Sequence, residues 1–362
     1  MTESHYQAGQ WVEVLGKEQI LATLDKQGRL DGLPFMPEMF QHCGKRFKVF
    51  KRAHKTCDTI NHSGGRRMAD AVHLEGSRCD GEAHGGCQAT CLIFWKSAWL
   101  KPVEGVSAAP EKRVGGPAGC TEEDVRAGTR AKGDEAAYVC QATQLFDATT
   151  PLKWWEFSQY VEDYTSGNAS IGRMLRGGIY AVYYMLVQCG LGLGPFLRWI
   201  YGLGPSLWGG LPYPRKTGAI PVGAPTPSFE LNLQPGEWVR IKSHDEILAT
   251  LNKENKNRGL YFDGEGVPFC GGTYRVVKRV NKILDEKTGK PVTFKNGSVI
   301  LEDVYCQSRY SACRMFCPRA ITSYWREIWL ERVDKAPGPA DAKPPVREEI
   351  ASGEHCGSVK GN

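Results

Sequence analysis

The sequence lacks a strong excess of charge of one sign. Its 46 lysines and arginines are offset by 40 aspartates and glutamates, which leaves a formal net charge of +6 over 362 residues. So small an imbalance does not provide the strongly basic surface with which nucleic-acid-binding proteins neutralise phosphates. We therefore expect no specific nucleic-acid binding and a protein partner instead; the sequence identifies no small-molecule substrate.

Common catalytic signatures are also missing. The chain contains no Walker A loop, no H-E-x2-H motif and no G-x-S-x-G motif. The run GLGLGP at 190–195 lacks the glycine spacing of a dinucleotide-binding loop, and Pro195 stands where the helix of such a loop should begin. These absences favour a protein that is not an enzyme, without deciding the question.

The N-terminal sequence MTESHYQAGQWVEV shows no basic segment followed by an apolar core, so we expect no secretory signal. This favours a cytoplasmic, reducing compartment, in which disulfides are rare. The 13 cysteines are then better explained by metal ligation or burial. Their odd number excludes complete pairing within the chain.

What the chain does contain is an internal repeat. GQWVEVLGKEQILATLDKQGRLDGLPF at 9–35 matches GEWVRIKSHDEILATLNKENKNRGLYF at 236–262, at an offset of 227 residues without a gap. HCGKRFKVFKR and FCGGTYRVVKR continue this register, and FWKSAWLKPV and YWREIWLERV close the two copies. We infer two corresponding domains, at 9–103 and 236–333.

Each copy has the pattern of a small β domain. Segments such as WVEVL, RFKVFKR and SVILEDV alternate apolar and polar residues, and EILATL adds one helical turn. Several short strands with one helical turn predict an SH3-like barrel in each copy. The fold class is therefore mainly β, with tandem duplicated small SH3-like barrels and a partly helical middle segment. We expect the tryptophans of the closing W-x3-W-L motif to fill the cores.

The remaining segments differ in composition. Residues 104–136 are rich in alanine, glycine and charge and predict a flexible linker, whereas 137–203 predict a helical, apolar segment. Residues 204–235 are rich in proline and glycine and predict an extended connector. The tail at 334–362 has the composition of a disordered segment.

Within the apolar segment, the run from Ile179 to Leu197 has only Gln188 as a polar residue. Its length would allow a helix to cross a bilayer. Glycines and Pro195 interrupt its second half, which favours a shorter helix lying in a membrane interface or on the β domains. A peripheral membrane contact through 178–203 is therefore one alternative, and full insertion is the less favoured one.

The two copies share four cysteine positions. The spacing is C-x35-C-x7-C-x3-C in the first copy and C-x35-C-x6-C-x3-C in the second. Four thiolates match the ligand number of tetrahedral zinc and of an iron–sulfur cluster. Buried reduced cysteines and two disulfides per domain are the less favoured alternatives. The predicted ligands are Cys43, Cys79, Cys87, Cys91, Cys270, Cys306, Cys313 and Cys317.

The residues leave the choice open between two zinc ions and two iron–sulfur clusters. Neither copy has the C-x2-C pair of common zinc ribbons, and a Cys-Pro pair typical of bacterial ferredoxins follows only at Cys317. His84 could replace one thiolate, but its counterpart in the second copy is Tyr310. Glu38 and Glu265 also correspond, and we expect both at solvated turns.

The motifs EILATL, CGGTYRVVKR and YWREIWLERV resemble those of an uncharacterised family of bacterial proteins with a duplicated cysteine-rich domain. The resemblance implies the duplicated layout and no particular activity. From the residues themselves we predict a tandem-domain binding or scaffold protein, in which a metal in each repeat has a structural role. The alternative is an iron–sulfur electron-transfer protein that serves a partner enzyme.

Overall fold

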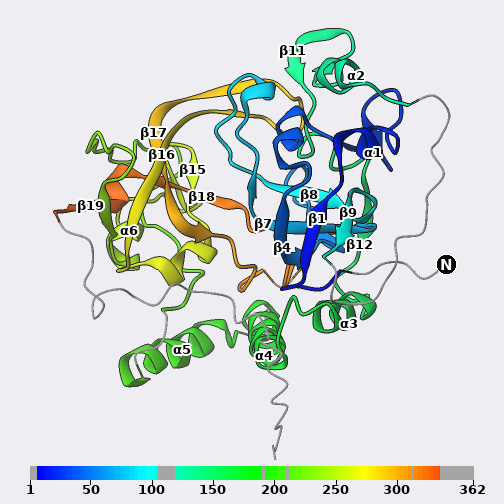
Figure 1. The fold of residues 1–362 in the computed structure, drawn as a ribbon. Helices are drawn as coiled ribbons and strands as arrows, with labels where there is room; N and C mark the ends of the chain where they lie inside the picture. Colours follow the sequence, from blue (N-terminus) through cyan, green and yellow to red (C-terminus); the bar gives the residue numbers. More distant parts are fainter. Residues whose placement is uncertain (1–5, 104–118, 190–191, 209–211, 312, 335–362) are drawn as a thin grey trace, which may run out of the picture.

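The computed structural model describes residues 6–103, 119–189, 192–208, 212–311 and 313–334, and Figure 1 shows their arrangement. The fold is mainly β, as the sequence predicts, and it contains two five-stranded sheets that each have a hydrophobic core. The helices of the middle segment lie along one side of these sheets, at the bottom of Figure 1.

The first copy forms a five-stranded antiparallel sheet with the order β8-β7-β4-β1-β9. Its strands are β1 (Trp11–Val14), β4 (Arg46–Arg52), β7 (Ala71–Arg78), β8 (Leu92–Lys96) and β9 (Leu100–Pro102). Alternation gives each strand a buried face, as Val12 and Val14 show in β1. The short elements of this copy are α1 (Lys17–Leu21), β2 (Arg29–Leu30), β3 (Leu33–Pro34), η1 (Pro37–His42), η2 (Glu82–His84) and η3 (Ser97–Trp99).

The second copy forms a sheet with the order β18-β17-β16-β13-β19, and each of its strands has a counterpart at the same place in the first sheet. Its strands are β13 (Trp238–Ile241), β16 (Thr273–Leu284), β17 (Pro291–Tyr305), β18 (Thr322–Arg326) and β19 (Leu330–Val333). Its short elements are α6 (His244–Leu248), β14 (Lys256–Asn257), β15 (Leu260–Tyr261), η4 (Gly264–Phe269) and η5 (Glu327–Trp329).

Matching tryptophan pairs fill the two cores, as the closing motif predicts. Trp95 and Trp99 are fully buried in the first core, and the ring of Phe35 meets both edge-on. Trp325 and Trp329 are arranged in the same way around Phe262 in the second core. The indole N–H of the second tryptophan of each pair donates to a threonine hydroxyl, so that burial leaves no unsatisfied donor there.

The two copies differ most in the hairpin that follows their second strand. In the second copy β16 and β17 form one long hairpin, whereas the first copy has the short strands β5 (Lys55–Cys57) and β6 (Gly65–Met68) at this place. These pair with β12 (Thr149–Leu152) from the middle segment in a separate sheet. The β16–β17 hairpin arches over toward the first copy (Figure 1), and at its turn Gly289 O accepts a hydrogen bond from the backbone N–H of Tyr138, in β11 (Asp134–Tyr138) of the segment between the copies.

Buried polar contacts also join the copies. The guanidinium of Arg319 donates to Thr59 Oγ1 at 2.8 Å and pairs with Glu286 at 3.2 Å. Arg78 of β7 donates to Thr322 Oγ1 at 3.1 Å, and Gln88 Oε1 accepts from two backbone N–H groups of β16. The copies therefore contact each other through hydrogen bonds, and the Arg319–Glu286 pair lies within the second copy.

The predicted linker is partly structured. Residues 119–136 contain α2 (Glu122–Ala127), the strand β10 (Arg130–Ala131) and the start of β11 (Asp134–Tyr138). The hydroxyl of Thr121 caps α2, and Val125 is buried in the first core. This segment is short and rich in charged residues, so its composition resembles that of a linker although it packs on the first core. Residues 104–118, and 335–362 of the predicted tail, lie outside the described residues.

The apolar middle segment forms α3 (Ser158–Thr165), α4 (Ile171–Gln188) and α5 (Gly194–Trp208). The glycine-rich stretch predicted to break a long helix separates α4 from α5. The predicted extended connector begins as a helix, because 204–208 belong to α5, whereas 212–235 contain no helix or strand apart from a single bridge at Ile220. Among the helices that the structure describes, none is both long enough and apolar enough to cross a membrane.

The buried tryptophan pairs give a direct test of the second core. We expect Trp325→Ala to lower the free energy of unfolding by about 3–5 kcal/mol, because it removes a large side chain that no solvent can replace. Trp11→Ala is the matched control: this indole is 55% exposed, and its removal should change stability by less than about 0.5 kcal/mol. Urea unfolding measures both, and equal effects would contradict the assignment of the core.

His73 gives a second test, by pH. Burial lowers the pKa of His73 to about 3, and its Nδ1 lies 2.9 Å from Ile93 O. The folded state therefore keeps this imidazole neutral while the unfolded chain takes up a proton below its ordinary pKa of about 6.5. Stability should fall by about 2 kcal/mol between pH 7 and pH 5 from this group. The amide of His73→Asn can still donate to Ile93 O but does not titrate, so urea unfolding should show a smaller loss of stability between pH 7 and pH 5. A variant whose stability falls with pH as steeply as that of the wild type would contradict the prediction.

Candidate metal site

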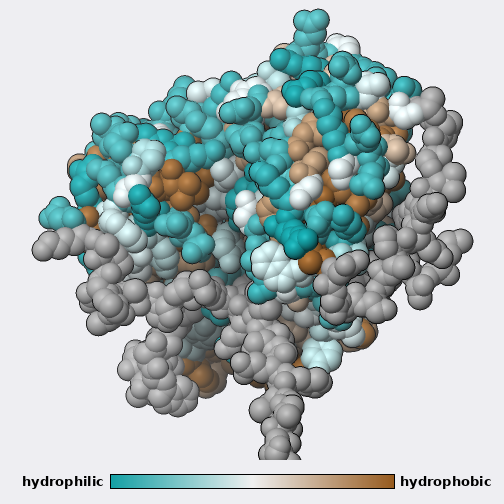
Figure 2. All heavy atoms as spheres, viewed as in Figure 1, coloured by the Kyte–Doolittle hydropathy of each residue, from teal (hydrophilic) through white to brown (hydrophobic). Residues whose placement is uncertain are grey.

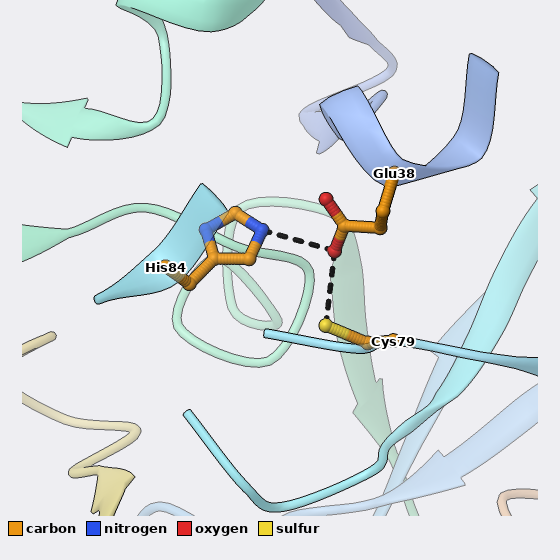
Figure 3. Close-up of side chains that lie close together, drawn as sticks. All are labelled: Glu38, Cys79 and His84. Carbon is orange, nitrogen blue, oxygen red and sulfur yellow. Dashed lines mark hydrogen bonds and ion pairs between the residues drawn. The ribbon is translucent and has the colours of Figure 1, made fainter. Parts of the chain in front are cut away.

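Three potential metal ligands of the first copy converge from three different elements (Figure 3). Glu38 is in the first turn of η1, Cys79 follows the last residue of β7, and His84 ends η2. The backbone between the last two makes a sharp reversal at Gly81, with φ +80°. Glycine is required there, because a Cβ would overlap the carbonyl oxygen of Cys87. The loop thereby turns the imidazole back toward η1.

The three side chains meet at one carboxylate oxygen. Cys79 Sγ lies 2.9 Å from Glu38 Oε1, and His84 Nε2 lies 3.1 Å from the same oxygen. Figure 3 shows the imidazole and the thiol approaching the carboxylate from different sides. Their three ligand atoms all lie within 4.8 Å of one another. We refer to Glu38, Cys79 and His84 as the triad.

Glu38 and His84 are buried and Cys79 is half-buried, and this controls the charges of the triad. Burial raises the pKa of Glu38, but the hydrogen bond and charge of His84 and the hydrogen bond of Cys79 together hold it below its usual value. Burial and the neighbouring Glu38 carboxylate raise the pKa of the Cys79 thiol. The carboxylate is therefore ionised, and the thiol stays protonated unless a cation compensates its charge.

Two polar atoms of the triad have no hydrogen-bond partner among the described residues. They are Glu38 Oε2 and His84 Nδ1, and both are buried. A buried polar atom without a partner costs free energy, so native structures leave few of them. Zinc sites use carboxylate oxygens, imidazole nitrogens and thiolate sulfurs as ligands, and the triad offers one of each.

The predicted four-thiolate sets are not gathered in the same way. Among the residues that the structure describes, the triad is the only group of three or more His, Cys, Asp or Glu ligands within 4.8 Å of one another. All of the predicted cysteines are reduced, and Cys79 alone belongs to that group. The eight-cysteine assignment therefore stays a prediction.

A cavity next to the triad collects further cysteines. Cys79, Cys87, Cys91 and Cys140 all line it, together with His84, and we call it the thiol cavity. Its empty volume is about 590 Å³, counting the part open to solvent. Cys140, from the middle segment, also lines this cavity. Cys43 is half-buried against the first core and does not line the cavity.

The second copy contributes one wall of the thiol cavity. Leu284 and Glu286 reach it from the β16–β17 hairpin, and Arg319 reaches it from the loop before β18. The backbone N–H of Leu284 lies 3.4 Å from Cys87 Sγ. The cavity is thus assembled from both copies and from the segment between them.

At the corresponding place in the second copy the arrangement is different. Glu265 is buried like Glu38, but it accepts the backbone N–H groups of Arg309 and Tyr310, at 3.0 and 2.6 Å. Tyr310 stands where the first copy has His84, so no imidazole is available. Cys270 packs in the second core and donates to Gly266 O at 3.8 Å, while Cys313 is exposed.

One pair of cysteines crosses between the copies. The thiol of Cys57 donates to Cys317, and together with the nearby cations Arg319 and Lys55 this lowers the pKa of Cys317. Cys57 has no counterpart in the second copy, so the repeat gave no reason to connect the two. Their contact depends on the way the copies pack, which sequence spacing does not reveal.

The sequence reasoning was wrong about two acids and missed one cysteine. Glu38 and Glu265, expected at solvated turns, are buried, because each anchors the loop that follows the third strand of its sheet. Their correspondence between the copies was the available signal. Cys140 was set aside because the second copy has no equivalent, and nothing in its local sequence points to the cavity.

No protein-family model matches the chain, and no curated protein matches it at a significant level. The site is therefore interpreted from its own geometry.

The turn at Gly81 offers a test of the geometry that positions His84. Gly81→Ala should destabilise the protein by more than the roughly 1–2 kcal/mol that a left-handed conformation alone costs an alanine, because the new Cβ meets the Cys87 carbonyl. Gly86→Ala is the matched control, since Gly86 also has positive φ but has open space around its Cα. Urea unfolding compares the two; equal losses would show that the Cys87 carbonyl imposes no steric constraint at Gly81.

Proposed function

We propose that the protein is a metal-binding protein that holds one zinc ion in its first copy, through Glu38, Cys79 and His84. The observation that carries the proposal is the convergence of a buried carboxylate, a half-buried thiol and a buried imidazole within 4.8 Å of one another. Oxygen, sulfur and nitrogen donors of these kinds bind zinc at about 2.0–2.3 Å. Small side-chain rotations bring all three atoms to such distances from a common point.

The proposed ion would satisfy the electrostatics of the triad. A divalent cation compensates the ionised Glu38 and permits loss of the Cys79 proton, which burial otherwise opposes. It also gives Glu38 Oε2, which has no hydrogen-bond partner among the described residues, a positive neighbour. Metal binding would then tie η1 to the loop after β7 and stabilise the first copy.

Zinc usually has four ligands, and the cavity suggests where the fourth comes from. Cys79 and His84 line the thiol cavity, whereas Glu38 does not, so the open side of the triad faces Cys87, Cys91 and Cys140. One of these thiols can complete a closed site. A closed site has no position for a reacting water, which favours a structural metal.

The wider proposal is a binding or scaffold protein built from tandem duplicated SH3-like domains. It is supported by the equal strand order of the two sheets and by the matching tryptophan pairs in their cores. In this proposal the first copy keeps the metal, and the second replaces it by backbone hydrogen bonds to Glu265. A protein partner, rather than a substrate, is the expected ligand.

One observation favours the second candidate, an iron–sulfur protein that transfers electrons to a partner enzyme. Four cysteines line the thiol cavity, and four thiolates are the usual ligand set of such clusters. A cluster holds its cysteines further apart than a single ion does, because each thiolate can bind a different iron. Their separation in this structure is therefore compatible with a cluster at the cavity rather than at the triad.

Elemental analysis of the purified full-length protein tests the proposal. We expect about one zinc per chain and no visible colour. Cys79→Ser and His84→Ala should each lose most of this zinc, because each removes one of three ligands from a buried site. Cys306→Ser, which changes the counterpart of Cys79 in the second copy, is the matched control and should keep the ion.

The other outcomes are equally informative. Two zinc ions, one of which is lost in Cys306→Ser, would replace the single site by the tandem four-thiolate sites. Brown protein with iron and sulfide that is lost in Cys140→Ser would establish the cluster instead. A colourless protein without metal after purification and zinc titration would rule out both candidates.

A further inference from the structure

The longest helix of the middle segment, α4, exposes an aliphatic stripe. Its members recur at intervals of three and four residues, which places them on one side of a helix. They are Ile171, Leu175, Ile179, Val182 and Leu186, and each is between 47% and 66% exposed. An amphipathic helix of a globular protein normally turns such a stripe toward the core.

The opposite side of α4 carries tyrosines and faces the protein. Tyr180 contacts the ring of Tyr310, and Tyr184 lies 4.5 Å from the guanidinium of Arg215. Tyr183 packs against Tyr213 and donates its hydroxyl proton to Leu197 O at 2.9 Å. The tyrosine side of α4 thus packs against the rest of the protein, and its aliphatic side faces solvent.

The neighbouring helices repeat this arrangement. One group of exposed apolar side chains lies on α3 and on the residue just before it, and a second group lies on α5. Both groups recur at helical spacing. The residues are Phe157, Val161 and Tyr164 for α3, and Phe196, Trp199, Ile200 and Leu203 for α5. Trp154 and Trp155, just before α3, are exposed as well. We call the outward side of α3, α4 and α5, with these two tryptophans, the helical face.

The helical face lies on one side of the molecule. Figure 1 shows α3, α4 and α5 below the two sheets, and in Figure 2 some hydrophobic atoms are visible along this lower edge. Three helices from consecutive parts of the chain therefore contribute to a single apolar surface, which is larger than scattered exposed side chains would give.

Charge distinguishes this surface from an ordinary protein interface. From Tyr164 to Phe229 the chain has no Asp or Glu, but it has five basic residues. Two of these, Arg176 and Arg198, are exposed on α4 and α5. The α3 end of the face does contain an acid, Glu156, between Trp155 and Phe157. Glu162 and Asp163 of α3 are paired with Arg67 and Lys55. The helical face is thus apolar and positive.

We propose that the helical face docks on an anionic lipid bilayer, with α3, α4 and α5 lying in the plane of its interface. Amphipathic helices of this length with aromatic residues and arginines bind such surfaces by burying their apolar side among the acyl chains. Tryptophans prefer the level of the headgroups, where Trp154, Trp155 and Trp199 would lie. The arginines would contact lipid phosphates.

A second copy of the chain fits this face less well than a bilayer does. Twofold symmetry would place the same face on both partners, and the arginines of α4 and α5 would then find no acid on the α4 and α5 of the other copy. A negatively charged lipid surface attracts these cations and also accepts the aliphatic stripe. The proposal is independent of the metal site, since no residue of the triad belongs to the helical face.

Vesicle co-sedimentation of the full-length protein tests the proposal. The probes are vesicles of phosphatidylcholine with about one-third phosphatidylglycerol, and vesicles of phosphatidylcholine alone, because binding should depend on anionic lipid and weaken with salt. Ile179→Glu combined with Trp199→Glu should weaken binding to the anionic vesicles at least tenfold. Both side chains are exposed, so the substitutions should leave the fold intact.

Val277→Glu combined with Val292→Glu is the matched control. These residues are also exposed, but they lie on β16 and β17. This variant should bind vesicles like the wild type, and circular dichroism should show the same folded signal for all three proteins. Equal loss of binding in both variants would overturn the proposal.

Two further results would also overturn it. The first is a wild-type protein that sediments with neither kind of vesicle. The second is a protein that is dimeric by light scattering without lipid and becomes monomeric in the Ile179→Glu, Trp199→Glu variant, because the face would then belong to a second copy.

Discussion

A buried glutamate at one position of the repeat organises the loop after the third strand of each sheet. Removing a carboxylate from water is costly unless hydrogen bonds or positive charge compensate it. The first copy compensates Glu38 with side chains, His84 and Cys79, and the second compensates Glu265 with backbone N–H groups. The same requirement thus leads to a triad of potential metal ligands in one copy and to a purely structural turn in the other.

The difference between the copies extends to their surroundings. The second copy has a long β16–β17 hairpin. In the first copy β4 and β7 pair over a shorter length, and the chain between them forms β5 and β6, which make a separate sheet with β12 of the middle segment. The long hairpin covers the loop that carries the cysteines of the first copy. Residues of both copies line the cavity beside Cys79, so the cavity forms only where the two copies meet.

The sequence was informative wherever a residue's environment is created by its own copy. Alternation located β1, β4, β7, β16 and β17, and the closing motif identified Trp95, Trp99, Trp325 and Trp329 as core residues. The glycines before Pro195 also predicted the break between α4 and α5. These features depend on local pattern and on burial within one domain, which a single sequence records.

It was less informative where the environment comes from another part of the chain. Cys140 and Arg319 reach the thiol cavity from segments far from the cysteines of the first copy, and Cys57 meets Cys317 only through domain packing. The sequence also did not predict the burial of Glu38. General burial tendencies describe an average glutamate, and this one has an imidazole beside it. Spacing alone therefore proposed thiolate cages, whereas the structure brings together a mixed set of donors.

The wall that Leu284, Glu286 and Arg319 form beside the cysteines has a consequence for biosynthesis. A ribosome releases the first copy and its triad long before these residues emerge, so the nascent chain presents its thiols to the surrounding medium. Folding of the C-terminal copy then closes that side. In the proposed metal-binding form, the order of synthesis would let an ion reach the triad before this wall is in place.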